Sequence, residues 1–146
     1  MKFETLTPAD ISVIYQIEQQ ANPYPWPRSA FDSSFSDLYL NIKLVNGDQI
    51  IGFIICKIVG DQAELFNICV NPAYQGKGYG KQLLQYLQTV LQQRIVAELW
   101  LEVRSSNKVA NALYQQQGFN CVDVRRNYYK NAQGSEDALI MCLYLS

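Results

Sequence analysis

The residues best suited to ligand chemistry form a glycine-rich turn, Gln75-Gly76-Lys77-Gly78-Tyr79-Gly80-Lys81. An apolar pattern with a period near 3.6 runs from Tyr79 to Leu91 and predicts an amphipathic helix directly after the turn. Glycine lets the backbone come close to a ligand, and the free N–H groups at a helix N-terminus favour phosphate, aided by the helix dipole. One interpretation is therefore a phosphate-binding turn, and the other is a flexible turn that only precedes a helix.

Two nucleotide-binding motifs compete for this turn. A P-loop requires the pattern G-x-x-x-x-G-K-[ST], but Gln75 stands five residues before Gly80 and Gln82 follows Lys81, so the pattern is absent. A dinucleotide fingerprint requires G-x-G-x-x-G close behind a strand, whereas the spacing here is G-x-G-x-G. Glu102 ends the next predicted strand, where a ribose-binding acid would stand, so the dinucleotide interpretation stays open.

Acid–base chemistry in this chain has to proceed without histidine, because the sequence contains none. This excludes Ser-His-Asp and Cys-His catalysis, histidine-bound metals and an imidazole base. Any proton transfer must therefore be carried by Glu, Asp, Tyr, Lys or Cys side chains.

The composition limits the function further. The chain has 146 residues, 49% of them hydrophobic, which suits one compact domain spanning residues 1–146. Twelve Lys and Arg residues against thirteen Asp and Glu give a net charge of −1, so we expect no direct nucleic-acid ligand. The N-terminus does not resemble a signal peptide, and the apolar runs are too short for a membrane span. We expect a cytoplasmic protein with no membrane partner, and a monomer is possible.

The four cysteines are far apart, form no C-x-x-C pair and lie mostly within apolar runs. They predict small buried side chains in a reducing compartment rather than disulfides. They are Cys56, Cys69, Cys121 and Cys142.

Periodicity and turn residues predict the element order βααβββαβαββ. A first helix begins near Thr7-Pro8-Ala9-Asp10, and three prolines between Asn22 and Pro27 predict a fixed loop. Asn46-Gly47 predicts a hairpin turn, and Gly118 predicts a helix C-terminus. The other ranges are a helix over 28–35, strands over 38–45, 49–59, 64–70 and 99–103, helices over 79–91 and 109–117, and strands over 119–124 and 138–145, with a polar connection between the last two. The mixture predicts an α/β fold in which helices pack on a mixed sheet.

Two longer motifs resemble those of the GNAT acetyltransferases. Val70-Asn71-Pro72-x-Tyr74-Gln75-x-x-Gly78-x-Gly80 is similar to the family's pyrophosphate-binding motif with its lead-in strand. The second, Leu101-Glu102-Val103-Arg104-x-x-Asn107-x-x-Ala110-x-x-Leu113-Tyr114-x-x-x-Gly118-Phe119, is similar to the family's last core motif. The resemblance covers essentially the whole chain. It implies the GNAT fold, a mixed and mostly antiparallel sheet with a splayed central strand pair, flanked by about four helices.

The resemblance also implies a ligand and the residues that hold it. Acetyl-CoA is the expected co-substrate, and no metal is expected. The backbone at a strand end would hold the pantetheine arm and the acetyl group, the glycine-rich turn would hold the pyrophosphate, and an asparagine would add a polar contact. These residues are Ile68, Cys69 and Val70, then Gly76, Lys77, Gly78, Tyr79, Gly80 and Lys81, and finally Asn107.

Two residues match the family's catalytic pair. A peptide α-amine has a pKa of about 8, so it needs a general base near neutral pH. Glu102 matches that base, and an ion pair with Arg104 or Lys108 is the alternative for its carboxylate. Tyr114 matches the general acid that protonates the departing thiolate, and packing on a core-facing helix surface is the alternative for its ring.

Within the family, the chain is most similar to bacterial enzymes that acetylate the N-terminal alanine of a small-subunit ribosomal protein. This implies direct attack of the α-amine on acetyl-CoA in a ternary complex. Another protein N-terminus, a lysine or a small amine stay open as acceptors, as does a non-catalytic acetyl-CoA-binding module. An acyl intermediate on Cys69 would be a different route, but no residue near it in sequence favours a thiolate, so we predict a packing role for it.

Aromatic residues outside these motifs are candidates for the walls of an acceptor site. They are Trp26, Tyr128 and Tyr129, and each of them could equally serve in the core or at a dimer contact. The resembling enzymes act on a substrate that is basic near its N-terminus. An acid at the mouth of the site, Asp37 or Glu136, would suit such a substrate.

Overall fold

The computed structural model describes residues 1–145 and contains a seven-stranded sheet with the order β1-β2-β3-β4-β5-β7-β6. Neighbouring strands are antiparallel except β4 and β5, which run parallel. The strands are β1 (Lys2–Thr5), β2 (Ile42–Asn46), β3 (Gln49–Val59), β4 (Gln62–Val70), β5 (Glu98–Arg104), β6 (Asn120–Asn131) and β7 (Gly134–Tyr144). The helices are α1 (Ile11–Ala21), α2 (Arg28–Asp32), α3 (Tyr79–Gln93) and α4 (Lys108–Gln116), with 3-10 turns η1 (Pro8–Asp10) and η2 (Pro72–Tyr74). The predicted α/β class and element order are confirmed.

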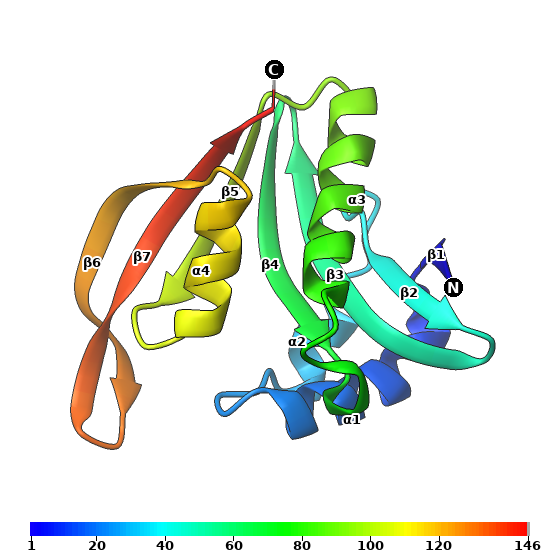
Figure 1. The fold of residues 1–146 in the computed structure, drawn as a ribbon, viewed down its shortest axis with the longest axis horizontal. Coiled ribbons are helices and arrows are strands. Elements are labelled where there is room, and N and C mark those ends of the chain that lie inside the picture. The colour runs from blue at the N-terminus through cyan, green and yellow to red at the C-terminus, as the bar shows by residue number, and fades with distance from the viewer. Residues whose placement is uncertain (146) are drawn as a thin grey trace.

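Helices cover both faces of the sheet (Figure 1). The apolar stripe of α3, which includes Leu84 and Leu87, packs with Tyr114 of α4 into one buried cluster. α1 and α2 contribute to a second cluster, which also contains Phe53 of β3. The neighbouring Ile54 belongs to the first cluster, as the alternation of side chains along a strand requires. The sheet therefore separates two hydrophobic cores, and a cavity that is open to both faces has to pass between two strands.

The parallel strands β4 and β5 pair only over their first halves. Their ladder ends at the pair Leu65 and Leu101, and the remainder of each strand diverges from the other. Phe66 is an extra residue at this point, because Leu65 and Asn67 face consecutive residues of β3. Such a bulge bends its strand and interrupts the ladder. The splayed strand pair of the GNAT fold is thus present, and the bulge at Phe66 marks where it opens.

Two predicted elements are longer than the real ones. α2 ends at Asp32 instead of residue 35, because the hydroxyls of Ser33 and Ser34 both donate to the carbonyl of Ala30 and replace helix bonds. β2 begins at residue 42 instead of 38, and the segment before it makes only an isolated bridge, between Tyr39 and Lys57. Gly118 follows the last turn of α4 with φ +95°, as predicted for a helix C-terminus.

The predicted polar connection between the last two strands is wrong. β6 and β7 continue toward each other as one long hairpin, with Asn131 paired to Gly134 at its tip. The register shifts between Arg125 and Tyr129, so an irregularity absorbs the residues that break the alternation. β6 lies at the edge of the sheet and is largely exposed, which is why a strand this polar is tolerated there.

The cysteine prediction is right for three positions and wrong for one. Cys56, Cys69 and Cys142 are buried, whereas Cys121 is exposed on β6, and all four are free thiols. An edge strand leaves side chains open to solvent even where the local sequence is apolar. Within residues 1–145, the structure has no helix with the length and hydrophobicity that a membrane crossing requires.

Candidate active site

An opening of about 310 Å³ lies between the diverging halves of β4 and β5. Tyr24 and Trp26 reach it from the loop between α1 and α2 on one face of the sheet. Tyr114 reaches it from α4 on the other face, and Glu102 and Tyr129 line it from β5 and β6. The splay therefore connects the two sides of the sheet, and it brings the predicted base and the predicted acid to one cavity.

The backbone of β4 is unpaired on the side that faces this opening. The N–H of Asn71 donates to the carbonyl of Ile51 on β3 at 2.7 Å. Backbone groups alternate along an antiparallel ladder, so Cys69 also directs its N–H toward β3, while Ile68 and Val70 direct theirs away from it. Beyond the end of the β5 ladder, these two N–H groups face the gap. Of the three predicted backbone contacts, those at Ile68 and Val70 are therefore best placed for a ligand.

The glycine-rich turn provides an open backbone surface at the start of α3. Gly76 and Gly78 have φ +77° and φ +83°, and a Cβ on either would meet no atom within 4 Å. Gly78 is the N-cap of α3 and supplies no side chain to the first N–H groups, which stay free for an anion. Lys77 and Lys81 are exposed beside the turn. Gln75 ties the turn to the end of β4, because its Nε2 donates to the carbonyl of Val70 at 3.1 Å.

Glu102 lies on the β5 face opposite α3, and its carboxylate accepts a hydrogen bond from the Tyr129 hydroxyl at 3.0 Å. Burial, reinforced by this carboxylate, raises the pKa of Tyr129 well above its ordinary value, so the phenol stays a donor. The alternative prediction, an ion pair of Glu102 with Arg104 or Lys108, is wrong, because both cations bind other groups. Arg104 pairs with Glu136 at 3.3 Å, and the Lys108 ammonium donates to the carbonyl of Ser105 at 3.0 Å.

Arg104 connects three segments around the opening. Its guanidinium lies 3.5 Å from the ring centre of Tyr24 and 4.3 Å from that of Tyr129. Nη1 also donates to the Glu136 carboxylate and to the carbonyl of Lys130. The arginine thus links the loop before α2 with the β6–β7 hairpin across the cavity.

The sequence offers Glu136 as an acid that could meet a basic acceptor. In the structure its carboxylate is instead bonded to groups of the protein itself. Its carboxylate accepts hydrogen bonds from the Ser106 N–H at 3.0 Å, from Arg104 at 3.3 Å and from Asn131 at 3.3 Å. These bonds, that from Ser106 above all, lower the pKa of Glu136 to about 2. The carboxylate is therefore paired within the protein, where it ties the turn between β5 and α4 to β7.

Tyr114 belongs to α4 and is buried, with its ring 5.5 Å from that of Phe119. Burial raises the pKa of its phenol well above the ordinary value, which keeps the proton on the oxygen at neutral pH. Tyr114 packs in the core and also lines the cavity, so its packing is confirmed and its role as the acid stays a prediction. Asn107 also lines the cavity, and its Oδ1 accepts from the N–H of Ala110 as the N-cap of α4.

The proline-rich loop is anchored by a buried carboxylate. Glu18 of α1 is fully buried, and its Oε2 accepts from the N–H of Trp26 at 3.0 Å and from Nδ2 of Asn22 at 3.2 Å. Burial and the nearby Glu18 charge raise the pKa of the Cys69 thiol well above its ordinary value. A thiol in this environment is a poor nucleophile, which agrees with the packing role predicted for Cys69.

The family of the chain can be decided from a comparison with known proteins. Residues 11–119 match the model of the acetyltransferase (GNAT) family. The chain belongs to the GNAT acetyltransferases. This GNAT protein is 47% identical over 141 residues to the ribosomal protein bS18-alanine N-acetyltransferase of Salmonella typhimurium, a match that covers 97% of this chain and 95% of that enzyme.

Two further comparisons agree with this assignment. The GNAT chain is 49% identical over 137 residues to the enzyme of the same name from Haemophilus influenzae, covering 93% of each. It superimposes with a TM-score of 0.96 on the crystal structure of the ribosomal-protein-S18-alanine N-acetyltransferase from Escherichia coli, at 45% identity and over 99% of this chain and 94% of that one.

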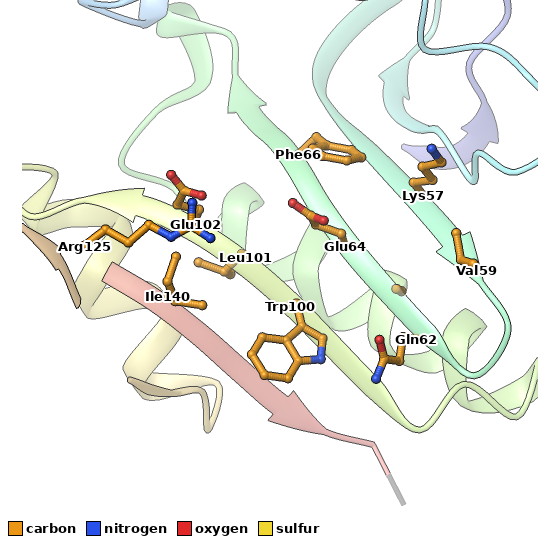
Figure 2. Close-up of a pocket in the computed structure, with 11 residues that line it drawn as sticks. Lys57, Val59, Gln62, Glu64, Phe66, Trp100, Leu101, Glu102, Arg125 and Ile140 are labelled. Atoms are coloured by element: carbon orange, nitrogen blue, oxygen red, sulfur yellow. The ribbon is translucent and has the colours of Figure 1, made fainter. Parts of the chain in front are cut away.

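A second cavity of about 430 Å³ adjoins the opening in this GNAT fold and shares Glu102 with it. Figure 2 shows Glu64 and Glu102 on the neighbouring strands β4 and β5, with Trp100 farther along the same cavity. Burial, and then the charge of Glu102, raise the pKa of Glu64 above its ordinary value. Lys57 and Arg125 also line this cavity, so the groove carries both signs of charge.

Sequence patterns located part of this site and missed the rest. Trp26 and Tyr129 line the opening, whereas Tyr128 lies outside it, half exposed, with its ring 5.1 Å from that of Tyr129. The roles of Glu18 and Arg104 were missed. Glu18 left a usable signal, because it is a carboxylate on the apolar stripe of a helix, and such a residue needs a buried partner.

Proposed function

We propose that this GNAT protein transfers the acetyl group of acetyl-CoA to the N-terminal α-amine of an alanine on ribosomal protein bS18. The support is the identity of about one residue in two, over nearly the full length, with enzymes named for this reaction. The observation that carries the chemistry is the single opening that Glu102 and Tyr114 share from opposite faces of the sheet. Residues 1–146 would act as one domain, in the cytoplasm where ribosomal proteins are made.

The acetyl-CoA site would extend from the splay to the start of α3. The free N–H groups of Ile68 and Val70 are suited to the pantetheine arm and to the acetyl oxygen, where charge develops during attack. The pyrophosphate would bind the turn from Gly76 to Lys81, whose glycines leave space for it. Asn107 would add a contact from the N-cap of α4. The chemistry supplied by acetyl-CoA is an activated acetyl group with a thiolate as leaving group.

Glu102 is the proposed base. An α-amine with a pKa of about 8 is mostly protonated at neutral pH and has to lose a proton before it can attack. The carboxylate is half-buried in the cavity and fixed in direction by Tyr129, and it accepts this proton directly or through a water.

Tyr114 is the proposed acid. Its buried phenol keeps its proton at neutral pH, so it can donate to the sulfur that departs when the amide forms. The reaction then proceeds by direct transfer in a ternary complex, without an acyl enzyme on Cys69. The acceptor would approach past Tyr24 and Trp26, with the adjoining groove as the path for its following residues.

Acetylation of synthetic peptides tests this function. A peptide with the N-terminal sequence of bS18 is incubated with acetyl-CoA and the protein, and thiol release and peptide mass are followed. We expect one acetyl group on the α-amine. Matched peptides with a blocked N-terminus and a free lysine, and simple amines, distinguish the other acceptors. Activity on lysine or small amines alone would contradict the assignment, and binding of acetyl-CoA with no turnover on any acceptor would indicate a non-catalytic module.

A further inference from the structure

Arg104 combines an ion pair with two aromatic contacts beside the opening. It lies between two aromatic rings, at 3.5 Å from the ring centre of Tyr24 and 4.3 Å from that of Tyr129, and its Nη1 pairs with Glu136 at 3.3 Å. The carbonyl of Lys130 accepts a further hydrogen bond from it. A planar guanidinium can satisfy all of these contacts at once, whereas a lysine ammonium cannot stack in this way.

The stack ends on the proposed base. A tyrosine side chain has two main torsions, so a guanidinium packed on its ring face limits the positions open to its hydroxyl. The Tyr129 hydroxyl is the donor to Glu102 at 3.0 Å. Arg104 therefore packs on the tyrosine whose hydroxyl holds the Glu102 carboxylate.

The other end of the stack reaches the acceptor side. Tyr24 belongs to the loop that lines the opening, and Glu18 anchors this loop through Asn22 and Trp26. The Tyr24 N–H also donates to Oδ1 of Asn22 at 2.9 Å. An acceptor that moved this loop would change the contact between Tyr24 and Arg104.

We propose that Arg104 is a positioning residue that couples the acceptor loop to the base, through the stack of Tyr24, Arg104 and Tyr129 and the bond from Tyr129 to Glu102. The inference rests on the proposed function, because it takes Glu102 as the base. It makes the alignment of the base depend on a correctly seated acceptor loop. Arg104 lines the opening as well, and the role assigned to it is to hold Tyr129 and not to exchange a proton with the substrates.

The test compares Arg104→Lys, Tyr129→Phe and the double variant in kinetics with acetyl-CoA and an N-terminal alanine peptide. Arg104→Lys keeps the charge and loses the stack, and we expect kcat to fall about tenfold. The KM for acetyl-CoA should stay within about twofold, because the stack lies away from the turn at α3. The double variant should be no slower than the slower single variant, because both substitutions interrupt the same series of contacts from Arg104 through Tyr129 to Glu102. Arg94→Lys, an exposed arginine at the end of α3, is the matched control.

A spectroscopic measurement makes the result independent of turnover. The carboxyl carbon of Glu102 is observed by carbon-13 NMR at pH 7, and Arg104→Lys and Tyr129→Phe should displace its signal in the same direction. Tyr24→Leu, which leaves the pair with Glu136 intact, should cause a smaller displacement of that sign. An unchanged signal and kcat in Arg104→Lys, or rate losses that multiply in the double variant, would overturn the proposal. A wild-type protein that acetylates no peptide would instead contradict the proposed function, while the NMR comparison still decides the role of Arg104.

Discussion

The Tyr129 hydroxyl of β6 donates a hydrogen bond to the Glu102 carboxylate of β5 at 3.0 Å, although these two strands are not neighbours in the sheet. β7 lies between β5 and β6, so the tyrosine reaches over it to the base. A carboxylate on a strand has several rotamers, and this bond selects one that lines both cavities. The relationship gives the β6–β7 hairpin a direct part in the proposed chemistry.

Tyr129→Phe removes only the hydroxyl and should therefore slow catalysis without changing the fold. A hydrogen bond to a charged group contributes about 1.5–3 kcal/mol, so kcat should fall by roughly tenfold or more. The KM for acetyl-CoA should not change. Burial raises the pKa of the phenol, so the wild-type enzyme should show no loss of rate from ionisation of Tyr129 below about pH 10. Steady-state kinetics over that pH range check both expectations. An unchanged kcat in Tyr129→Phe would contradict the first, and a loss of wild-type rate below about pH 10 that the variant lacks would contradict the second.

Tyr114→Phe tests the proposed acid. The ring would still pack against Phe119, so thermal stability should change little. Without the phenol the thiolate departs unprotonated, and kcat should fall about 100-fold while the affinity for CoA is retained. Isothermal titration with CoA and single-turnover kinetics separate the two effects. A variant with full kcat would mean that Tyr114 only packs.

Glu18→Leu tests the anchor of the acceptor loop. Leucine has about the size of the glutamate and suits the buried position on α1. The Trp26 N–H and the Asn22 amide, however, lose their acceptor, and the loop loses its fixed position. We expect the KM for peptide to rise about tenfold and the affinity for acetyl-CoA to remain. Equal KM values in the variant and the wild type would show that the loop is held by other contacts.

Glu136→Gln should change the pH dependence of stability. The folded state lowers the pKa of Glu136 to about 2 from an ordinary value of 4.5. The carboxylate therefore stabilises the fold above about pH 4.5, and this contribution is lost as the pH falls toward 2. At pH 7 the variant should melt at a lower temperature than the wild type, and the two melting temperatures should converge by about pH 2. Calorimetry at several pH values measures this, and a constant difference across the range would argue against the ion pair.

The parts of the site that the sequence predicted are those built from neighbouring residues. The glycine-rich turn, α3 and Gly118 follow from short-range pattern and backbone chemistry, and all three are found in the structure. The resemblance added the splay and nominated Glu102 and Tyr114, which lie together in the opening. Their roles as base and acid stay predictions.

The parts that the sequence did not predict depend on contacts between distant segments. Tyr24 and Arg104 are far apart in sequence, and no local pattern around either residue predicts that the guanidinium packs on the ring. The bulge at Phe66 has no glycine or proline to mark it, because its position follows from the pairing register of β3. The long β6–β7 hairpin was missed because its residues are polar, and an edge strand tolerates polar residues on both faces.

The most direct test of the account is the acetylation of a bS18 N-terminal peptide by the wild type and by Glu102→Gln, followed by mass spectrometry of the intact peptide. The variant keeps the size of the side chain and loses the base. We predict one acetyl group on the α-amine with the wild type, and a rate at least about 100-fold lower with Glu102→Gln, at unchanged affinity for acetyl-CoA. A Glu102→Gln variant with the same rate and the same pH–rate profile as the wild type would contradict the assignment of Glu102 as the base.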